Sequence, residues 1–146
     1  MTDRPLPFFV YGTLRTGQRN HSHFLGGRCV RIEPAVLAGA TLHEGPGYPY
    51  VVTDPDLGKQ VHGELITVRP DEFAQVLAAL DELEGCRPDG TGLYLRLPLP
   101  VTVAADPAAA HSERVTAWVY LAGRDQAARL RAHPAPIASG DWTGGR

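Results

Sequence analysis

Apolar residues in this chain gather in short runs that are separated by turns rich in glycine and proline, a pattern typical of β-strands. Valine, isoleucine and aromatic residues, which favour strands, recur within these runs. We therefore predict strands at residues 8–12, 35–42, 50–53, 61–68, 93–99 and 115–121, with a turn at 43–47, and residues 101–103 can continue the fifth strand. Pro98 and Pro100 place that fifth strand at a sheet edge or a bulge, because proline has no N–H to donate.

One segment, residues 71–84, has the spacing of an amphipathic helix. It follows a proline, which suits a first helical turn, and Gly85 can end it. Shorter helices are predicted at residues 18–25 and 125–131, the second capped by Asp125. The apolar stripe of the long helix consists of Phe73, Val76, Leu77 and Leu80.

The order of these elements predicts the fold class. About six strands with only one or two substantial helices do not alternate, which argues against a doubly wound parallel sheet. We predict an α+β fold, a small mixed β-barrel of about six strands with a few helices packed outside. The length predicts a single domain over residues 1–146. Residues 106–111 read as a loop, and the tail from Pro134 is too rich in proline and glycine for regular structure.

Composition and charge narrow the class of protein. The chain is 43% hydrophobic and 21% charged, as is ordinary for a globular protein. A net charge of -2 offers no basic field to nucleic acid or a membrane surface, and no apolar run is long enough to span a bilayer. Residues 1–5 do not resemble a signal peptide, and Cys29 and Cys86 lie far apart. We expect a cytoplasmic protein with reduced thiols that binds neither nucleic acid nor membrane.

The first predicted strand runs into a polar turn that contains Gly12 and Gly17. Glycine permits a positive φ and the close approach of a ligand, since it has no Cβ. Successive N–H groups in such a turn can converge on an anion or a developing oxyanion. The glycine spacing fits a phosphate-binding loop, but Gln18 and Arg19 stand where that motif needs Lys and Ser or Thr. The turn is therefore another kind of ligand-binding loop or an ordinary strand-to-loop junction.

Three acids close the long helix: Asp81, Glu82 and Glu84. Each residue turns about 100° around the axis, so Glu84 comes within about 20° of Phe73 in the apolar stripe. Glu82 points to the opposite side and Asp81 flanks the stripe, so we expect their amide variants to cost little. A lone carboxylate on a buried face is costly unless paired or used, although fraying would also let it reach water. Burial and the helix dipole would both raise the pKa of Glu84, as a general base near neutral pH requires.

Seven short motifs follow one another along the chain. They are VYGTLR at residues 10–15 (with Gly17 and Asn20 after it), GYPY at 47–50, VHGELITV at 61–68, LDELEG at 80–85, GLYLR at 92–96, AWVY at 117–120 and SGDW at 139–142. Each motif is weak alone. Their order and spacing together resemble the γ-glutamylcyclotransferase-like family, also called AIG2-like, whose members open with a strand ending in Tyr-Gly-Ser or Tyr-Gly-Thr. The resemblance covers nearly the whole chain.

The resemblance implies the same α+β barrel and a reaction by intramolecular aminolysis. The α-amine of a γ-glutamyl group attacks its own γ-carbonyl, giving 5-oxoproline and a free amine. The partner is then a small-molecule γ-glutamyl amine, peptide or acylated metabolite, and neither cofactor nor metal is needed, since the nucleophile is already tethered. The family's catalytic glutamate is the second acid of an L-D-x-x-E-G motif, which makes Glu84 the general acid/base of this chain.

The resemblance also implies substrate-binding positions. Backbone N–H groups of the first turn would hold the charged or developing-anion oxygens of the substrate, and aromatic residues would line its pocket. Tyr94 and Tyr120 are equally compatible with plain strand core. Arg15 and Asn20 either contact a carboxylate or lie solvated at the loop surface. The implied substrate-binding residues are Tyr11, Gly12, Thr13, Leu14, Tyr94 and Tyr120.

Alternatives to an enzyme stay open on the residues alone. The same fold could be a binding module that holds a small acidic or amide ligand without turnover, whereas an interaction domain with no pocket would leave Glu84 unexplained. No carboxylate or cysteine stands at a spacing that would complete a metal site with the histidines, so we predict none. Neither the leaving amine nor the oligomeric state follows from the sequence. The histidines considered are His21, His23, His43 and His62.

Overall fold

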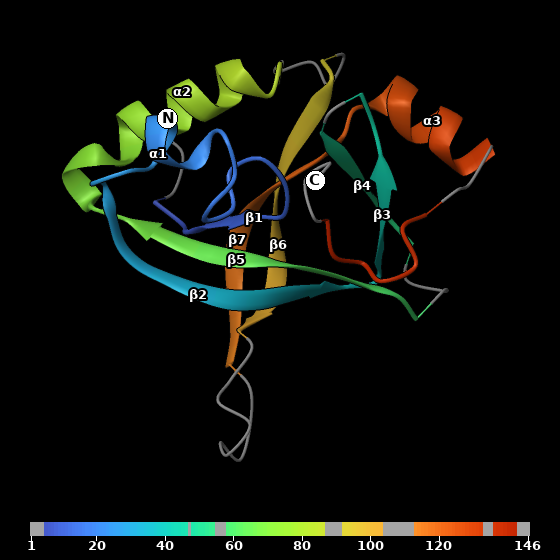
Figure 1. Cartoon of the computed structure of the whole chain (residues 1–146), viewed down its shortest axis with the longest axis horizontal. Coiled ribbons are helices and arrows are strands. Elements are labelled where there is room, and N and C mark those ends of the chain that lie inside the picture. Colours follow the sequence, from blue (N-terminus) through green and yellow to red (C-terminus); the bar gives the residue numbers. More distant parts are fainter. Residues whose placement is uncertain are drawn as a thin grey trace.

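The structure is a computed structural model that describes residues 5–46, 48–54, 58–86, 92–103, 113–132 and 136–142. Figure 1 shows β2 and β5 crossing beneath α2, with β6 and β7 running across them. Among the described helices, none has the length and apolar character needed to cross a membrane. The elements are β1 (Phe8–Val10), α1 (His21–Phe24), β2 (Cys29–Ala38), β3 (Ala40–Glu44), β4 (Pro49–Thr53), β5 (Gln60–Val68), η2 (Pro70–Glu72), α2 (Phe73–Leu83), β6 (Tyr94–Val103), β7 (Glu113–Ala122) and α3 (Arg124–Ala132).

Five strands close into a barrel in the order β1, β5, β2, β6 and β7. Neighbouring strands pair antiparallel, except that β1 and β7 pair in parallel, with Phe8 opposite Trp118, and so close the barrel. Strands β3 and β4 form a separate two-stranded sheet. The predicted α+β fold with a mixed barrel is confirmed. The barrel has five strands rather than about six, because β3 and β4 pair with each other.

The barrel strands serve two cores, since successive side chains of a strand point to opposite faces. Phe8 and Ile66 pack with α2, and the ring of Phe8 stacks on that of Phe73 with centroids 5.7 Å apart. Phe9 and Leu65 belong to the second core. The predicted helix is confirmed, with the 3-10 helix η2 as its first turn. Its buried residues are Phe73, Val76, Leu77 and Leu80.

The predicted strand at residues 35–42 is two strands in two different sheets. β2 begins earlier, at Cys29, and ends at Ala38, and Gly39 then has a φ of +71°. Glycine adopts this left-handed conformation readily, so the chain turns out of the barrel although its apolar pattern continues. The predicted turn at 43–47 starts later than expected, because His43 and Glu44 complete β3.

Strand β6 continues without a break through its prolines. It pairs along its whole length with β7, whereas its described pairing with β2 is confined to Thr102 and Val103. Pro98 and Pro100 therefore lie where β6 has a described neighbour on one side only, which suits residues without an N–H. The strand is not a sheet edge, since β6 lies between β2 and β7 in the closed barrel, but its prolines lie where it has one described partner.

Helix α2 ends in a Schellman motif. Gly85 has a φ of +62°, its N–H donates to the carbonyl of Glu82 (3.1 Å), and the N–H of Cys86 donates to the carbonyl of Asp81 (2.9 Å). Glu84 is the C-cap residue, enclosed by these bonds. The predicted ending at Gly85 is confirmed, and the helix end is tied down at Glu84 rather than frayed.

The segment 136–142 contains no helix or extended strand, as predicted for the tail, yet it packs closely on the rest of the fold. The N–H of Ile137 donates to the carbonyl of Leu42 (2.7 Å), and that of His62 to the carbonyl of Gly140 (2.7 Å). Trp142 is only 3% exposed and joins the second core. A composition unfavourable for regular structure is therefore compatible with ordered packing.

The two shorter helices occur where they were predicted. α1 lies inside the expected range of residues 18–25. α3 begins one residue earlier than expected, at Arg124, so Asp125 lies in its first turn and not at the N-cap. The predicted loop at residues 106–111 lies outside the described residues.

Candidate active site

The end of β1 and the end of α2 meet at a cavity of about 30 Å³, which we call the inner cavity. Tyr48 and Pro49 at the start of β4, Tyr94 on β6 and Tyr120 on β7 complete its wall. The structure thus brings together residues from five separate parts of the chain. Every residue to which a catalytic or substrate-binding role was assigned lines this cavity, namely Tyr11, Gly12, Thr13, Leu14, Glu84, Tyr94 and Tyr120.

The loop after β1 is held by its own hydrogen bonds. The N–H of Arg15 donates to the carbonyl of Gly12 (3.0 Å), and Asn20 donates from its N–H to the carbonyl of Thr13 (3.0 Å) and from Nδ2 to Oγ1 of Thr13 (2.9 Å). The N–H of Thr16 donates to Glu64 on β5 (2.7 Å). Within the described part of the chain, the N–H groups of residues 12–14 donate to no protein acceptor. They are therefore available to a ligand.

Glycine is required at position 12 for a reason that the sequence did not indicate. Gly12 does not have a positive φ; in this loop that conformation belongs to Gly17, at +87°. A Cβ at position 12 would instead lie 2.8 Å from Cγ and Cδ of Pro49. The close approach of Pro49 from the two-stranded sheet therefore explains the glycine, and it makes Pro49 part of the cavity wall.

Glu84 is half-buried and, as the C-cap of α2, lines the inner cavity. Among the described residues its carboxylate has neither a hydrogen-bond partner nor an ion pair. Burial, and after it the neighbouring charge of Asp81, raise the pKa of Glu84 to about 7. The expected direction of the pKa shift is thus supported. Its second cause is a charged neighbour, where the sequence suggested the helix dipole.

Asp81 is the centre of a cluster that the sequence reasoning missed. Arg96 on β6 donates to it twice, from Nε (2.8 Å) and from a terminal nitrogen (3.1 Å), and the hydroxyl of Tyr120 on β7 donates to it at 2.6 Å. The Arg96 guanidinium lies over the ring of Trp118, 4.3 Å from its centroid. Asp81 therefore joins the helix end to the barrel wall, and the expectation that its amide variant would cost little must be revised. The sequence feature that could have indicated this cluster is Arg96, a charged residue within an apolar strand.

Three tyrosines of the inner cavity, Tyr11, Tyr94 and Tyr120, donate their hydroxyl protons to the protein. Tyr11 donates to the carbonyl of Tyr120, and Tyr94 donates to the carbonyl of Pro49 at 2.6 Å. The rings of Tyr50 and Tyr94 stack with centroids 5.0 Å apart. Burial is the largest cause that raises the pKa of Tyr11, Tyr94 and Tyr120, so these groups stay neutral. Each of the three hydroxyls is therefore held in place by an acceptor within the protein.

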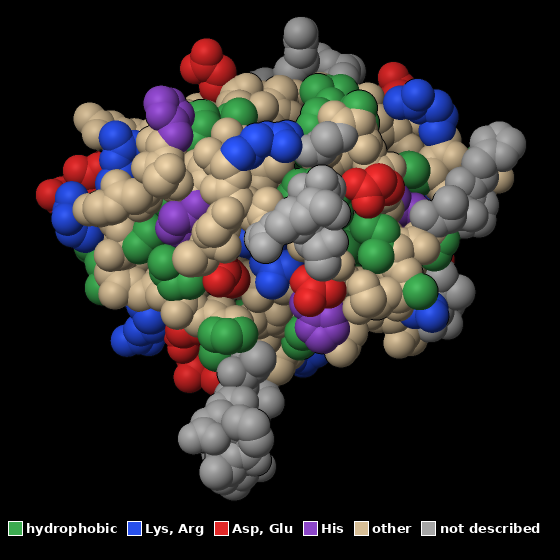
Figure 2. Space-filling view, in the orientation of Figure 1, with side chains coloured by type: hydrophobic (Ala, Val, Ile, Leu, Met, Phe, Trp, Pro, Cys, Tyr) green, Lys and Arg blue, Asp and Glu red, His purple; other side chains and the backbone are tan. Residues whose placement is uncertain are grey.

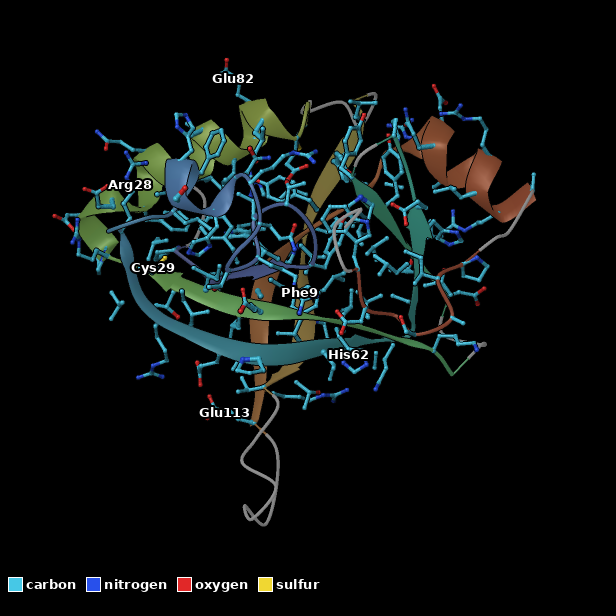
Figure 3. The ribbon with its side chains drawn as sticks, viewed as in Figure 1. Phe9, Arg28, Cys29, His62, Glu82 and Glu113 are labelled. Atoms are coloured by element: carbon cyan, nitrogen blue, oxygen red, sulfur yellow. The ribbon has the colours of Figure 1, made fainter. Side chains whose placement is uncertain are left out.

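Other candidate residues serve the fold. Arg15 forms an ion pair with Asp141 (2.5 Å) and donates to the carbonyl of Trp142 (3.3 Å), which ties the loop to the C-terminal segment. Figure 3 shows Glu82 pointing outward from α2, as its helical position predicted. No group of metal-ligating side chains gathers among the described residues, and His43 contacts Thr41. Acidic and basic side chains are interspersed over the face in Figure 2.

The chain is similar to known proteins both in sequence and in structure. Residues 8–144 match the family described as γ-glutamyl cyclotransferase, AIG2-like. The chain is 38% identical over 109 residues to a γ-glutamylaminecyclotransferase from Bos taurus, and 36% identical over 124 residues to one from Rattus norvegicus. A crystal structure of an AIG2-like protein from Mus musculus superposes with a TM-score of 0.58 at 28% identity, covering 80% of this chain and 76% of that one.

The matched lengths differ between these relatives. The alignment covers 68% of this chain but only 58% of the bovine protein. With the rat protein it covers 77% of this chain and 74% of the relative. The chain therefore spans a little over half of the bovine relative's length.

Proposed function

The chain belongs to the γ-glutamyl cyclotransferase, AIG2-like family, and we propose that it releases 5-oxoproline from a γ-glutamyl amine, peptide or acylated metabolite. One observation carries the proposal. A half-buried carboxylate without a partner among the described residues, that of Glu84, lines the same cavity as the available N–H groups of residues 12–14. A proton acceptor and an anion-binding turn in one cavity are the two elements that acyl transfer to a tethered amine needs.

The proposed reaction is an intramolecular acyl transfer. The α-nitrogen of the γ-glutamyl group forms a bond to the γ-carbonyl carbon, and the bond from that carbon to the leaving nitrogen breaks. The α-nitrogen gives up one proton before attack and a second after it; the leaving nitrogen takes one as its bond breaks, and the other passes to water or to the released amine, which becomes an ammonium ion. The products are 5-oxoproline and the free amine.

Glu84 would carry these protons. A carboxyl group with a pKa of about 7 is half ionised at neutral pH, so its basic form can accept a proton from the α-ammonium. Its acid form can then deliver a proton to the leaving nitrogen. An ordinary glutamate would be a much weaker base, because its pKa of 4.5 lies far below neutrality.

The turn and the tyrosines would position the substrate. The N–H groups of residues 12–14 can hold the α-carboxylate or the oxyanion that develops on the γ-carbonyl oxygen. Tyr94 and Tyr120 are fixed by hydrogen bonds, so the cavity wall that they form is preformed. A preformed wall that bends the γ-glutamyl chain brings its own amine to its own carbonyl, which is the main requirement of a tethered reaction.

The cysteines take no part in this scheme. Cys29 and Cys86 are free thiols, and burial raises the pKa of both, which keeps them protonated. Free thiols fit a reducing compartment, and we place the reaction in the cytoplasm.

A panel of γ-glutamyl amines and γ-glutamyl peptides, incubated with the protein, tests the proposal. Mass spectrometry should detect 5-oxoproline with at least one member, and Glu84→Gln should abolish most of it while Glu82→Gln does not. Tight binding of a γ-glutamyl compound without release of 5-oxoproline would replace the enzyme with a binding module. Absence of both binding and turnover across the panel would refute each reading.

A further inference from the structure

The C-terminal segment of residues 139–142 lies beside the inner cavity without being among the residues that line it. The segment is fixed at Gly140, whose N–H donates to the carbonyl of Ile137 (3.0 Å) and whose carbonyl accepts from the N–H of His62 on β5 (2.7 Å). Gly140 has a φ of +67°, and a Cβ there would lie 2.2 Å from the carbonyl oxygen of Gln60. Glycine is therefore required for this close approach, which gives the segment a fixed position on the barrel.

Arg15 joins this segment to the turn after β1. Its Nη1 donates to the carboxylate of Asp141 (2.5 Å) and to the carbonyl of Trp142 (3.3 Å), and its backbone N–H donates to the carbonyl of Gly12 (3.0 Å). Because the Arg15 side chain is only 23% exposed, its ion pair is partly shielded from water. Asp141 is held in turn by Ser139, whose hydroxyl oxygen accepts from the N–H of Asp141 (3.2 Å). We call the contacts of Arg15 with Asp141 and Trp142 the clamp.

Trp142 gives the clamp a rigid base. It is buried in the second core, and its indole N–H donates to the carboxylate of Glu44 at the end of β3 (3.0 Å). Its ring atom Cε3 lies 3.9 Å from the point that a Cβ on Gly12 would occupy. Glu44 pairs with Pro49, which lines the inner cavity. The clamp therefore holds the turn against a residue that also contacts the two-stranded sheet.

The turn of residues 12–14 depends on such support from outside. Its N–H groups donate to no acceptor within the described part of the chain, while Asn20 and Glu64 hold other parts of the same loop. The turn can hold a substrate oxygen only while these N–H groups converge on one point, so a small displacement would slow the reaction. On the basis of the proposed function, we propose that Asp141 is a positioning residue, which acts through Arg15 and holds the turn in the geometry that binds the substrate.

Asp141→Ala tests this role, because it removes the carboxylate and leaves the backbone bonds of the segment in place. The amide hydrogens of Arg15 and Asn20, whose bonds close the turn, should exchange with solvent deuterium about fivefold faster, the size expected for loss of one partly exposed ion pair. The amides of α2 should exchange as in the wild type. For the γ-glutamyl compound that the wild type converts fastest, kcat/KM should fall about tenfold, because the turn no longer holds the substrate in a reactive geometry.

Two further variants assign the loss to the clamp. Arg15→Gln should have the same effects as Asp141→Ala, and the double variant should lose little more than either single one, because both changes remove the same contact. Glu72→Gln is the matched control, since Glu72 forms ion pairs with Arg28 (3.2 Å) and Arg69 (3.4 Å) and does not line the inner cavity. This control should change neither kcat/KM nor the exchange at the turn.

The remaining outcomes separate the clamp from the reaction. Unchanged exchange at Arg15 and Asn20 in Asp141→Ala, or faster exchange with kcat/KM within twofold of the wild type, overturns the positioning role and leaves the cyclotransferase standing. A shift in the acidic limb of kcat/KM also overturns it, since the charge of Asp141 would then act on Glu84 and not on the turn. Absence of 5-oxoproline from the whole panel with the wild type refutes the proposed function itself, whatever the exchange shows.

Discussion

Two carboxylates at the end of α2, Asp81 and Glu84, stand one helical turn apart in opposite surroundings. Asp81 accepts two hydrogen bonds from Arg96 and one from Tyr120. Glu84 is half-buried as well, but it has no partner for its carboxylate among the described residues. The same helix end therefore carries one satisfied acid and one unsatisfied acid.

This difference separates a structural role from a chemical one. A paired carboxylate keeps its charge and holds two elements together, whereas a desolvated carboxylate without a partner holds a proton near neutral pH. Asp81 also acts on Glu84 through space, since its charge raises the pKa of Glu84. In the proposed function, the anchored charge of Asp81 would tune the proton affinity of Glu84.

The largest effect should follow from Glu84→Gln, which keeps the shape of the side chain and removes its proton chemistry. We expect turnover to fall on the order of a hundredfold to ten-thousandfold, the usual contribution of a positioned acid or base. Binding of a γ-glutamyl ligand, followed by calorimetry, should survive. Glu82→Gln is the matched control and should retain normal turnover; the reverse pattern would show that the helix register has been assigned to the wrong acid.

The second-largest effect should follow from Asp81→Asn, which removes the charge of the carboxylate that is paired with Arg96 and Tyr120. Loss of the charge-assisted bonds to Arg96 and Tyr120 should lower the free energy of unfolding by about 1.5–3 kcal/mol, measured in urea. Removal of the negative charge should also lower the pKa of Glu84, so the acidic limb of kcat/KM should move to lower pH. An unchanged limb in a folded variant would mean that Asp81 only anchors the helix.

A smaller effect should come from Gly12→Ala, which tests whether the turn after β1 belongs to the substrate site. The added methyl would meet Pro49 at 2.8 Å, so one of the two must shift, at a cost of about 1–3 kcal/mol. We expect KM to rise more than kcat falls, because in the proposed function the turn binds substrate and does not transfer the proton. Normal kinetics in this variant would remove the turn from the site.

The smallest expected effect is a change in the melting temperature of Glu84→Gln. The folded-state pKa of Glu84 is about 7 and its ordinary value is 4.5, so the folded protein binds this proton more tightly than the unfolded chain does. The stability that results is complete below about pH 4.5 and is lost as the pH rises through 7. Glu84→Gln should therefore melt at a higher temperature than the wild type at pH 8 and at nearly the same temperature at pH 4. Equal melting curves at both values would contradict a desolvated Glu84.

The sequence predicted most of the elements and the position of the candidate acid. Helical periodicity and a glycine at position 85 placed Glu84 at a capped helix end, because both are local properties of the chain. Short apolar runs likewise predicted the strands. The break at Gly39 escaped notice, since an apolar run carries no mark of where the chain leaves one sheet for another.

The contacts that complete the site depend on tertiary structure. Asp81 meets Arg96 and Tyr120 only because α2 packs beside β6 and β7, which are distant in the sequence. The contact of Gly12 with Pro49 likewise requires the two-stranded sheet to fold back on the barrel. Periodicity assigns a face to each residue, but the partner on the other side of that face comes from the fold.

Direct titration of Glu84 tests the central claim, that its carboxyl is desolvated, unpaired and ready to exchange a proton at neutral pH. Carbon-13 NMR of protein labelled at the glutamate side-chain carboxyl carbons would follow each group across pH 3–9, and the resonance absent from Glu84→Gln would identify the one concerned. We predict a midpoint for Glu84 at about 7, moving lower in Asp81→Asn. A midpoint near the ordinary glutamate value of 4.5 would contradict the account.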